Sequence, residues 1–272
     1  MGRVRPAVLA VAGSDPSGGA GIQADLKTLA AHGVYGMAAV TTLTAQNTLG
    51  VTGVWPCPPE VLAAQLETAF SDIVPAAVKL GMLGSEALAR TVGEALAKFT
   101  PERVVADPVM RSSSGAELLT AEGVRVLREE IFPRAALITP NLPEAEALTG
   151  RTVASGAEME RAARRLSETY GCAVLCKGGH SSGSPDDFLW WENQGLWLRG
   201  RRVDNPNAHG TGCTLSSAIA ANLARGLPMD RAAARAKEYL TGALAAMLDL
   251  GRGNGPLDHG YALHGPFFDG SI

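Results

Sequence analysis

The chain has 272 residues, of which 46% are hydrophobic and 5% aromatic, so aliphatic side chains must fill most of a large core. Its formal net charge is -3 and no basic block occurs, which argues against nucleic acid or an anionic membrane surface as a partner. The first apolar run stops at Gly13, too short for a bilayer span, and the four cysteines form no C-x-x-C pair. We therefore expect a cytoplasmic protein in which residues 1–272 form a single domain.

Short apolar runs alternate with longer helical patterns along the chain. The predicted strands are 7–12, 37–43, 78–83, 103–106, 136–138 and 172–176. The predicted helices follow the first Gly-rich loop as far as Gly33 and then cover 58–71, 85–99 and a segment from Ser155 to Gly171. This alternation predicts right-handed crossovers and a three-layer α/β/α fold with a mostly parallel central sheet.

One stretch interrupts the alternation. Residues 187–191 and 196–199 flank Asn193-Gln194-Gly195, a pattern typical of a small antiparallel hairpin. The hairpin leads into a Gly-rich segment, 208–213, and then into a long helix with an apolar stripe. No linker or internal repeat is visible, so the hairpin belongs to the same predicted domain.

Polar and Gly-rich segments follow the predicted strands. Ligand sites in parallel sheets lie at the carboxyl ends of the strands, so these segments are the candidate site. They are Gly13-Ser14-Asp15, Thr44-Ala45-Gln46, Asp107-Pro108, Thr139-Pro140-Asn141 and Lys177-Gly178-Gly179.

The first Gly-rich loop, residues 13–21, has four glycines in nine positions, which lets backbone approach a ligand closely. Residues 19–24 match the G-x-G-x-x-A pattern of dinucleotide sites, which would indicate a dehydrogenase. However, these glycines do not follow the strand directly, and the next strand ends in Thr44-Ala45-Gln46 rather than in an acidic residue. The dinucleotide interpretation is therefore disfavoured.

A second Gly-rich segment, Gly210-Thr211-Gly212-Cys213, opens a predicted helix. Backbone N–H groups at a helix N-terminus bind anions, and the same position should lower the pKa of the Cys213 thiol. Asp107, Glu144 and Lys177 lie at strand ends, where carboxylates can hold Mg²⁺ and a lysine can offset phosphate charge. Together these features indicate a nucleotide phosphate site. Since no G-x-x-x-x-G-K-[ST] motif occurs, a P-loop kinase of the usual form is excluded.

Seven stretches along the chain resemble the hydroxymethylpyrimidine/phosphomethylpyrimidine kinases of thiamine biosynthesis, within the ribokinase-like superfamily. They are AGSDPSGGAGIQADLKTL (12–29), TAQNTLGV (44–51), KLGMLG (79–84), DPVM (107–110), TPNLPEAEALTG (139–150), KGGH (177–180) and AHGTGCTLSSAIAA (208–221). The resemblance implies an ATP- and Mg²⁺-dependent kinase, expected to be a homodimer, that phosphorylates the pyrimidine alcohol and then its monophosphate.

The resemblance also implies residue roles. Residues bordering the pyrimidine would be Asp15, Gln46, Met82 and Val109. Residues serving ATP and its Mg²⁺ would be Asn141, Glu144, Lys177 and Thr211, with Asp107 and Glu144 as the metal ligands. The anion hole would comprise Gly210, Gly212 and Cys213, with Cys213 near the attacking hydroxyl as the candidate base.

Two segments depart from the family pattern. The loop 111–115 lacks a lysine that the family often carries, and the hairpin region 187–203 is poorly matched. The main alternative is a pyridoxal-type kinase, or one enzyme acting on both rings. An alternative of another class is a non-catalytic pyrimidine-binding protein that has kept the fold.

Overall fold

The computed structural model describes residues 5–111, 118–179 and 184–264. The strands are β1 Ala7–Ser14, β2 Tyr35–Asn47, β3 Gly50–Pro56, β4 Ala77–Leu80, β5 Val104–Ala106, β6 Leu137–Ile138, β7 Ala173–Cys176, β8 Asp187–Trp191 and β9 Gln194–Leu198. The α-helices are α1 Gly21–Ala31, α2 Pro59–Asp72, α3 Glu86–Phe99, α4 Ala121–Val126, α5 Leu142–Thr149, α6 Gly156–Tyr170, α7 Thr211–Ala224 and α8 Met229–Ala245. A π-helical turn, Leu127–Ile131, and a short 3₁₀ helix, Phe132–Arg134, follow α4.

One sheet of nine strands runs through the molecule in the order β3-β2-β1-β4-β5-β6-β7-β8-β9. The six strands from β2 to β7 are parallel neighbours, and β7–β8 and β8–β9 pair antiparallel. The mostly parallel sheet and the hairpin at 187–199 are thus confirmed. The sequence analysis missed β3, which pairs antiparallel with a β2 that runs on to Asn47, four residues past the predicted end.

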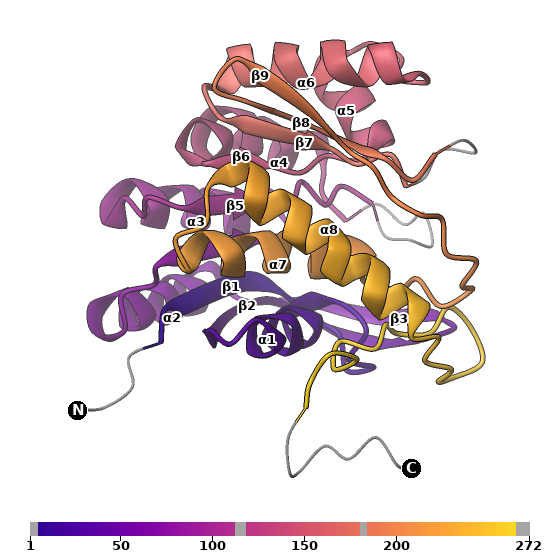
Figure 1. Cartoon of the computed structure of the whole chain (residues 1–272). Helices are drawn as coiled ribbons and strands as arrows, with labels where there is room; N and C mark the ends of the chain where they lie inside the picture. Colours follow the sequence, from indigo (N-terminus) through magenta and orange to yellow (C-terminus); the bar gives the residue numbers. More distant parts are fainter. Residues whose placement is uncertain (1–4, 112–117, 180–183, 265–272) are drawn as a thin grey trace.

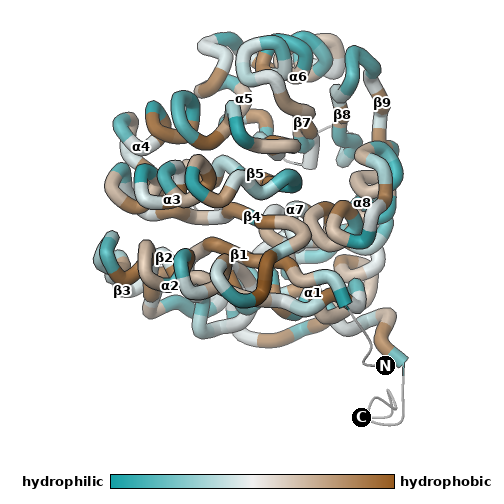
Figure 2. The backbone as a smooth tube through the Cα atoms, turned by 90° about the vertical axis from the view of Figure 1, so that its left-hand side faces the viewer, coloured by the Kyte–Doolittle hydropathy of each residue, from teal (hydrophilic) through white to brown (hydrophobic). Residues whose placement is uncertain are grey.

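Helices cover both faces of the sheet, as Figures 1 and 2 show from two directions. Helices α2 to α6 form one layer, and α1, α7 and α8 form the other. Side chains alternate between the layers along each strand: on β1, Val8 packs with α7 and α8, whereas Leu9 packs with α2 and α3. The mainly aliphatic core expected from the composition lies in these two interfaces.

The chain reverses its direction of travel across the sheet between β1 and β4. Strand β1 lies between β2 on one side and β4 on the other, so the loops after β1 and β4 diverge. In open parallel sheets the crevice at such a switch point, at the carboxyl ends of the strands, is the usual ligand site. Among the described residues, no helix is both long and apolar enough to cross a bilayer.

Candidate active site

The carboxyl edge of the sheet brings together the segments that the sequence analysis selected. Asp15 follows β1, Gln46 lies near the end of β2, Asp107 follows β5, and Lys177 follows β7. Because β1, β2, β5 and β7 belong to the parallel set, these side chains leave the sheet at the same edge. The start of α7 lies above this edge, since a Cβ placed on Gly212 would be 3.3 Å from Asp107 Oδ2 and 3.5 Å from Lys177 Nζ.

The two Gly-rich segments pack backbone against backbone. Gly210 has φ 83°, a left-handed conformation that favours glycine, and a Cβ there would collide with the carbonyl oxygen of Gly19. A Cβ on Gly19 would likewise collide with the ring of His209, the residue directly before Gly210. The glycines at these positions are therefore needed for the close approach of the two loops.

Asp15 organises the first loop from inside. It is 2% exposed, and Oδ1 accepts hydrogen bonds from the Ser17 N–H and hydroxyl at 2.9 and 2.7 Å. Oδ2 accepts from the Ala20 N–H at 2.9 Å and lies 2.9 Å from Nε2 of His209. Burial raises the pKa of Asp15, but these hydrogen bonds, that of His209 foremost, outweigh burial and leave its pKa below the ordinary value. Asp15 is therefore an ionised structural anchor.

His209 is a site residue that the sequence analysis missed. His209 is 8% exposed, and its ring joins Asp15 to the half-buried Gln46, whose amide nitrogen lies 3.0 Å from His209 Nε2. The only sequence signal was its position directly before Gly210, within the Gly-rich segment 208–213. The relevant partner lies 194 residues away along the chain, at Asp15.

Met82 and Val109, the apolar residues predicted to border the pyrimidine, are both partly exposed at the same edge. Met82 reaches toward the first loop, because a Cβ on Gly13 would collide with its terminal methyl group. The Val109 N–H donates to the Asp107 carbonyl at 2.8 Å, which folds the chain tightly after β5. The described part of this loop ends at Arg111, so the segment 112–115 that departs from the family pattern lies outside the described residues, as does His180.

Charged groups gather on the other side of the start of α7. Lys177 Nζ lies 2.6 Å from Asp107 Oδ1, which also accepts from the Thr139 hydroxyl at 3.0 Å. Burial lowers the pKa of Lys177, but the carboxylates of Asp107 and Glu144 outweigh it and raise that pKa. Lys177 is therefore a permanent cation next to the start of α7, as a phosphate site requires.

Glu144 and Asn141 form a capping box at the start of α5. The Asn141 side chain accepts from the Glu144 N–H at 2.9 Å, and Glu144 accepts from the Asn141 N–H at 2.8 Å. Burial raises the pKa of Glu144 to about 7, against the opposing effect of Lys177 and with help from Asp107. Glu144 is thus a carboxyl group poised to ionise when a cation arrives.

The prediction for the Cys213 thiol is wrong in direction. Burial raises the pKa of Cys213, and the nearby Asp25 and Asp107 raise it further. Lys79 and the Gly21 N–H act in the opposite direction but do not compensate. Position at a helix N-terminus alone therefore does not make this thiol a thiolate at neutral pH.

A fully buried ion pair lies against helix α7. Lys79 of β4 contacts both carboxylate oxygens of Asp25 of α1 at 2.8 and 2.9 Å, and both side chains are 0% exposed. The Ser217 hydroxyl of α7 donates to Asp25 at 2.7 Å. The sequence signal was a lysine inside the apolar run before Gly81, which the sequence analysis did not use. This cluster joins three elements that lead into the site.

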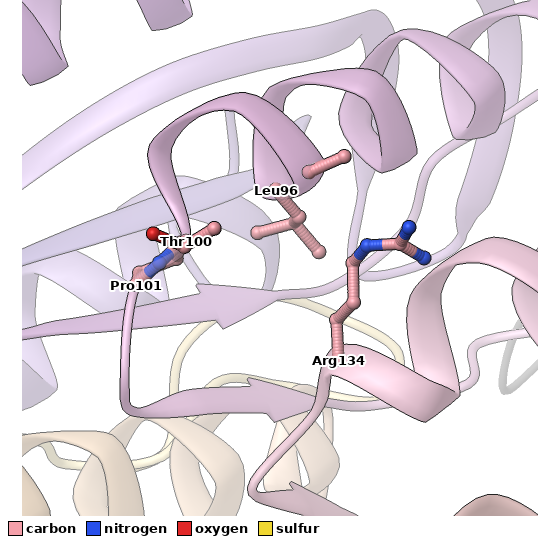
Figure 3. Close-up of a pocket in the computed structure, with 5 residues that line it drawn as sticks. Leu96, Thr100, Pro101 and Arg134 are labelled. Atoms are coloured by element: carbon pink, nitrogen blue, oxygen red, sulfur yellow. The ribbon is translucent and has the colours of Figure 1, made fainter.

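The pocket drawn in Figure 3 does not lie at the carboxyl edge of the sheet. It has a volume of about 370 Å³ and is lined by Leu96, Ala97, Thr100, Pro101 and Arg134. Thr100 and Pro101 precede β5, and Arg134 precedes β6, so the hollow lies at the amino ends of the strands. The Arg134 guanidinium donates to the Glu130 carbonyl at 2.6 Å, and the other lining side chains offer little chemistry. The carboxyl edge remains the candidate site.

The carboxylates at the carboxyl edge suit a metal that is shared with phosphate. Within the described ranges, no group of three or more His, Cys, Asp or Glu side chains is placed to hold a metal ion. Mg²⁺ commonly uses only one or two carboxylates and takes its remaining ligands from phosphates and water. Asp107 and the partly protonated Glu144 fit that donor set, whereas they do not fit a metal held by protein alone.

Comparison with known proteins agrees with the geometry. The family model for phosphomethylpyrimidine kinase matches residues 15–258. The chain is 47% identical over 258 residues to the hydroxymethylpyrimidine/phosphomethylpyrimidine kinase of Streptomyces coelicolor, covering 95% of this chain and 96% of that protein. It is also 47% identical over 256 residues to the thiamine biosynthesis bifunctional protein ThiED of Geobacter sulfurreducens, covering 94% of this chain but only 52% of that longer protein.

A solved structure extends the comparison to the fold. The ADP complex of Bacillus subtilis pyridoxal kinase matches with a TM-score of 0.88 at 35% sequence identity, covering 95% of this chain and 98% of that chain. The predicted three-layer ribokinase-like architecture is therefore confirmed. The motifs, the fold and the family match agree: this chain belongs to the phosphomethylpyrimidine kinase family.

Proposed function

We propose that the chain transfers the γ-phosphoryl group of ATP to 4-amino-5-hydroxymethyl-2-methylpyrimidine, and then phosphorylates the monophosphate to the diphosphate. The observation that carries this proposal is the position of the α7 start. Gly212 lies beside Asp107 and Lys177, whereas Gly210 packs on the loop that Asp15 and His209 organise. One anion-binding helix start therefore adjoins both a charged region and a hydrogen-bonding region.

The charged region suits the nucleotide. Lys177 would offset phosphate charge, and Asn141 and Thr211 would contribute polar contacts near it. Asp107 and Glu144 would hold Mg²⁺, which supplies charge neutralisation for the β- and γ-phosphates when bound. Glu144 would release its proton when Mg²⁺ binds, because a nearby divalent cation favours the ionised carboxylate.

The start of α7 would carry most of the rate. Its backbone N–H groups would face the position where charge accumulates on the transferred group, and Gly210 and Gly212 would keep side chains away from it. The thiol of Cys213 is neutral in the unliganded chain, so it would not take the proton of the attacking hydroxyl before the transfer begins. A loose phosphoryl-transfer transition state needs little help from a base, which makes this arrangement sufficient.

A second candidate substrate is pyridoxal. The likeness to the Bacillus subtilis pyridoxal kinase, at a TM-score of 0.88, favours an enzyme that accepts both alcohols. Both substrates are nitrogen heterocycles that carry a hydroxymethyl group, so the α7 start and the nucleotide region would serve either one. The hydrogen-bonding region around Gln46 would decide between them.

We also propose that the chain acts in the cytoplasm as a homodimer. Edge strand β3 and its partner β2 expose large apolar side chains, among them Trp55 at 58% and Leu43 at 57%. Covering such side chains with a second copy would remove apolar surface from water and protect an open sheet edge. Light scattering of the purified chain should give twice the mass of one chain, and a single-chain mass would contradict the dimer.

Mass spectrometry of products tests the activity. The chain is incubated with Mg-ATP and either the pyrimidine alcohol or pyridoxal, and products are followed over time. We expect pyrimidine monophosphate first and diphosphate later, with matching ADP. Binding of the pyrimidine without any ATP consumption would instead identify a non-catalytic binding protein. Monophosphate that never yields diphosphate would remove the second step.

A further inference from the structure

We propose that residues 248–256, which follow α8, form a strap that holds the β2–β3 turn against the loop before α7, with Thr48 and Asn207 as its positioning residues. The strap would keep in place the wall of the site on the side proposed for the alcohol. This inference rests on the proposed function and adds to it a segment that lies outside the seven stretches carrying the family resemblance.

The end of the β2–β3 hairpin extends beyond the rest of the sheet. Strand β1 pairs with β2 only as far as Ser14, which lies opposite Leu43, and β3 is the edge strand. Residues 44–53 therefore continue as two paired strands without a third. A two-stranded hairpin alone is marginally stable in water, so its position depends on contacts besides strand pairing.

The strap packs on the turn of this hairpin, and Figure 1 shows the segment in yellow beside β3. The half-buried Thr48 hydroxyl accepts from the N–H groups of Arg252 and Gly253 at 3.2 and 3.3 Å. A Cβ on Gly253 would collide with the Thr48 carbonyl oxygen and lie 3.2 Å from the Cα of Leu49. Only a residue without a side chain allows this approach, so backbone lies directly on backbone.

Asn207 closes the other end of the strap. It is 6% exposed, its Nδ2 donates to the Leu248 carbonyl at 3.0 Å, and its Oδ1 accepts from the Gly255 N–H at 2.9 Å. One amide, with donors and acceptor on the same group, thus joins the beginning of the strap to its end. The Ala208 N–H donates to Asn254 Oδ1 at 2.8 Å and adds a second connection to the loop before α7.

The strap also contacts the hydrogen-bonding region of the site. The His209 N–H donates to the Gly255 carbonyl at 3.2 Å, and His209 forms an isolated parallel bridge with Pro256. A Cβ on Gly19, in the first Gly-rich loop, would lie 3.3 Å from Pro256. The strap therefore connects the β2–β3 turn, the loop before α7 and the first Gly-rich loop. Loosening it should disturb the alcohol more than the nucleotide.

The test measures kcat and the KM values for the pyrimidine alcohol and for Mg-ATP in Thr48→Val, which keeps the side-chain shape but removes the acceptor. Loss of two hydrogen bonds should raise the alcohol KM by about 3- to 10-fold, with kcat and the ATP KM unchanged. Thr48→Ser keeps the hydroxyl and should behave as the parent chain. Thr52→Val is the matched control, because the Thr52 hydroxyl donates to the Ala45 carbonyl at 3.1 Å, within the hairpin itself.

Two further measurements test the strap as a unit. Asn207→Asp keeps the acceptor for Gly255 but cannot donate to Leu248, so it should raise the same KM. Because both changes release one strap, the double variant with Thr48→Val should show no more than the larger single effect. Hydrogen exchange of residues 44–53 without ligand should be faster in Thr48→Val than in the parent chain or in Thr52→Val, a result that does not depend on kinase activity.

The outcomes separate the strap from the kinase function. Parent values of the alcohol KM and of hydrogen exchange in Thr48→Val overturn the strap and leave the kinase function intact. Equal increases in the two KM values, or fully additive effects in the double variant, also overturn it, because they indicate general loosening or two independent contacts. A parent chain that phosphorylates neither the pyrimidine alcohol nor pyridoxal contradicts the proposed function, and the inference with it.

Discussion

The two sides of the proposed anion hole, at the start of α7, are built on different principles. On the side of Asp15, His209 and Gln46, polar groups are joined by hydrogen bonds that the protein itself satisfies. On the side of Asp107, Glu144 and Lys177, two carboxyl groups compete for one lysine, and burial raises the pKa of Glu144 to about 7. The first side is preorganised, whereas the second has charges that the protein alone does not balance.

This difference suits the two ligands proposed for the two sides. A neutral heterocycle brings directional hydrogen bonds but no charge, so rigid, oriented partners select it. A nucleotide with its metal brings several charges, so a region with a permanent cation and a carboxyl group able to ionise can respond to it. Variants of the two sides should therefore fail in different ways.

The largest expected effect lies beneath both sides, at the buried pair of Lys79 and Asp25. Lys79→Met leaves Asp25 charged and unpaired in the core, which should lower the free energy of unfolding by about 3–5 kcal/mol. Denaturation with urea measures the loss.

Lys98→Met is the matched control, because Lys98 pairs with Glu67 at the surface, where the two side chains are 59% and 54% exposed. Removal of that pair should cost only about 0–1 kcal/mol. Equal losses in the two variants would show that the buried pair does not hold the two sides together.

The next largest effect is on kcat, and it distinguishes a buried lysine at the candidate site from an equally buried lysine elsewhere. Lys177→Met should lower kcat by roughly 10²–10³-fold, as expected for loss of one preorganised group that stabilises transferred charge. Lys237→Met is a close control, since the Lys237–Asp187 pair has side-chain exposures of 12% and 2%, the same as the Lys177–Asp107 pair. It should affect stability but not kcat. A normal kcat in Lys177→Met would remove Lys177 from the nucleotide region.

A smaller loss of rate is expected at Cys213. Because burial keeps its pKa high, the thiol is neutral at pH 7, and Cys213→Ala should lower kcat by less than about 10²-fold, the lower end for removal of a general base. Alkylation of Cys213 by iodoacetamide should accordingly be slow at pH 7 and increase only above the ordinary thiol range. A loss of kcat near 10⁴-fold, or fast alkylation at pH 7, would show that Cys213 acts as a thiolate base after all.

The smallest effect concerns pH. The pKa of Glu144 rises from 4.5 to about 7 on folding, so the folded chain holds a proton that the unfolded chain releases between these values. Folding stability from this group is therefore full below pH 4.5 and is lost as pH rises toward about 7.

Comparison with Glu144→Gln isolates this contribution, because glutamine can still accept from the Asn141 N–H. The difference in unfolding free energy between the two chains should change by on the order of 1–2 kcal/mol between pH 5 and pH 7.5. Parallel stability curves over this range would show that Glu144 ionises normally.

Most of the fold followed from local sequence patterns. The alternation of short apolar runs and helical segments predicted the parallel sheet, because each run is buried on both faces. Strand β3 was missed, since the run Gly50–Pro56 is an edge strand with exposed apolar side chains and little alternation. Its pairing depends on the length of β2 and the two-residue turn at Thr48 and Leu49, which no periodicity reveals.

The candidate site was likewise predictable only where its residues are marked by local sequence. Asp107, Glu144 and Lys177 were found because polar residues directly after strands are conspicuous in a sequence. His209 and the pair of Lys79 and Asp25 were missed, because their partners are far away along the chain and only the fold brings them together. The pKa of Cys213 was predicted with the wrong sign for a similar reason: the helix N-terminus is local, but burial and neighbouring carboxylates are not.

The central claim, that the two sides recognise different ligands, is tested most directly by calorimetric titration of both ligands into two variants. Gln46→Ala should weaken binding of the pyrimidine alcohol by about 1–3 kcal/mol and leave Mg-ATP binding unchanged. Lys177→Met should do the reverse. If each variant weakens both ligands equally, the two sides form one undivided site, and the separation of pyrimidine recognition from nucleotide recognition is wrong.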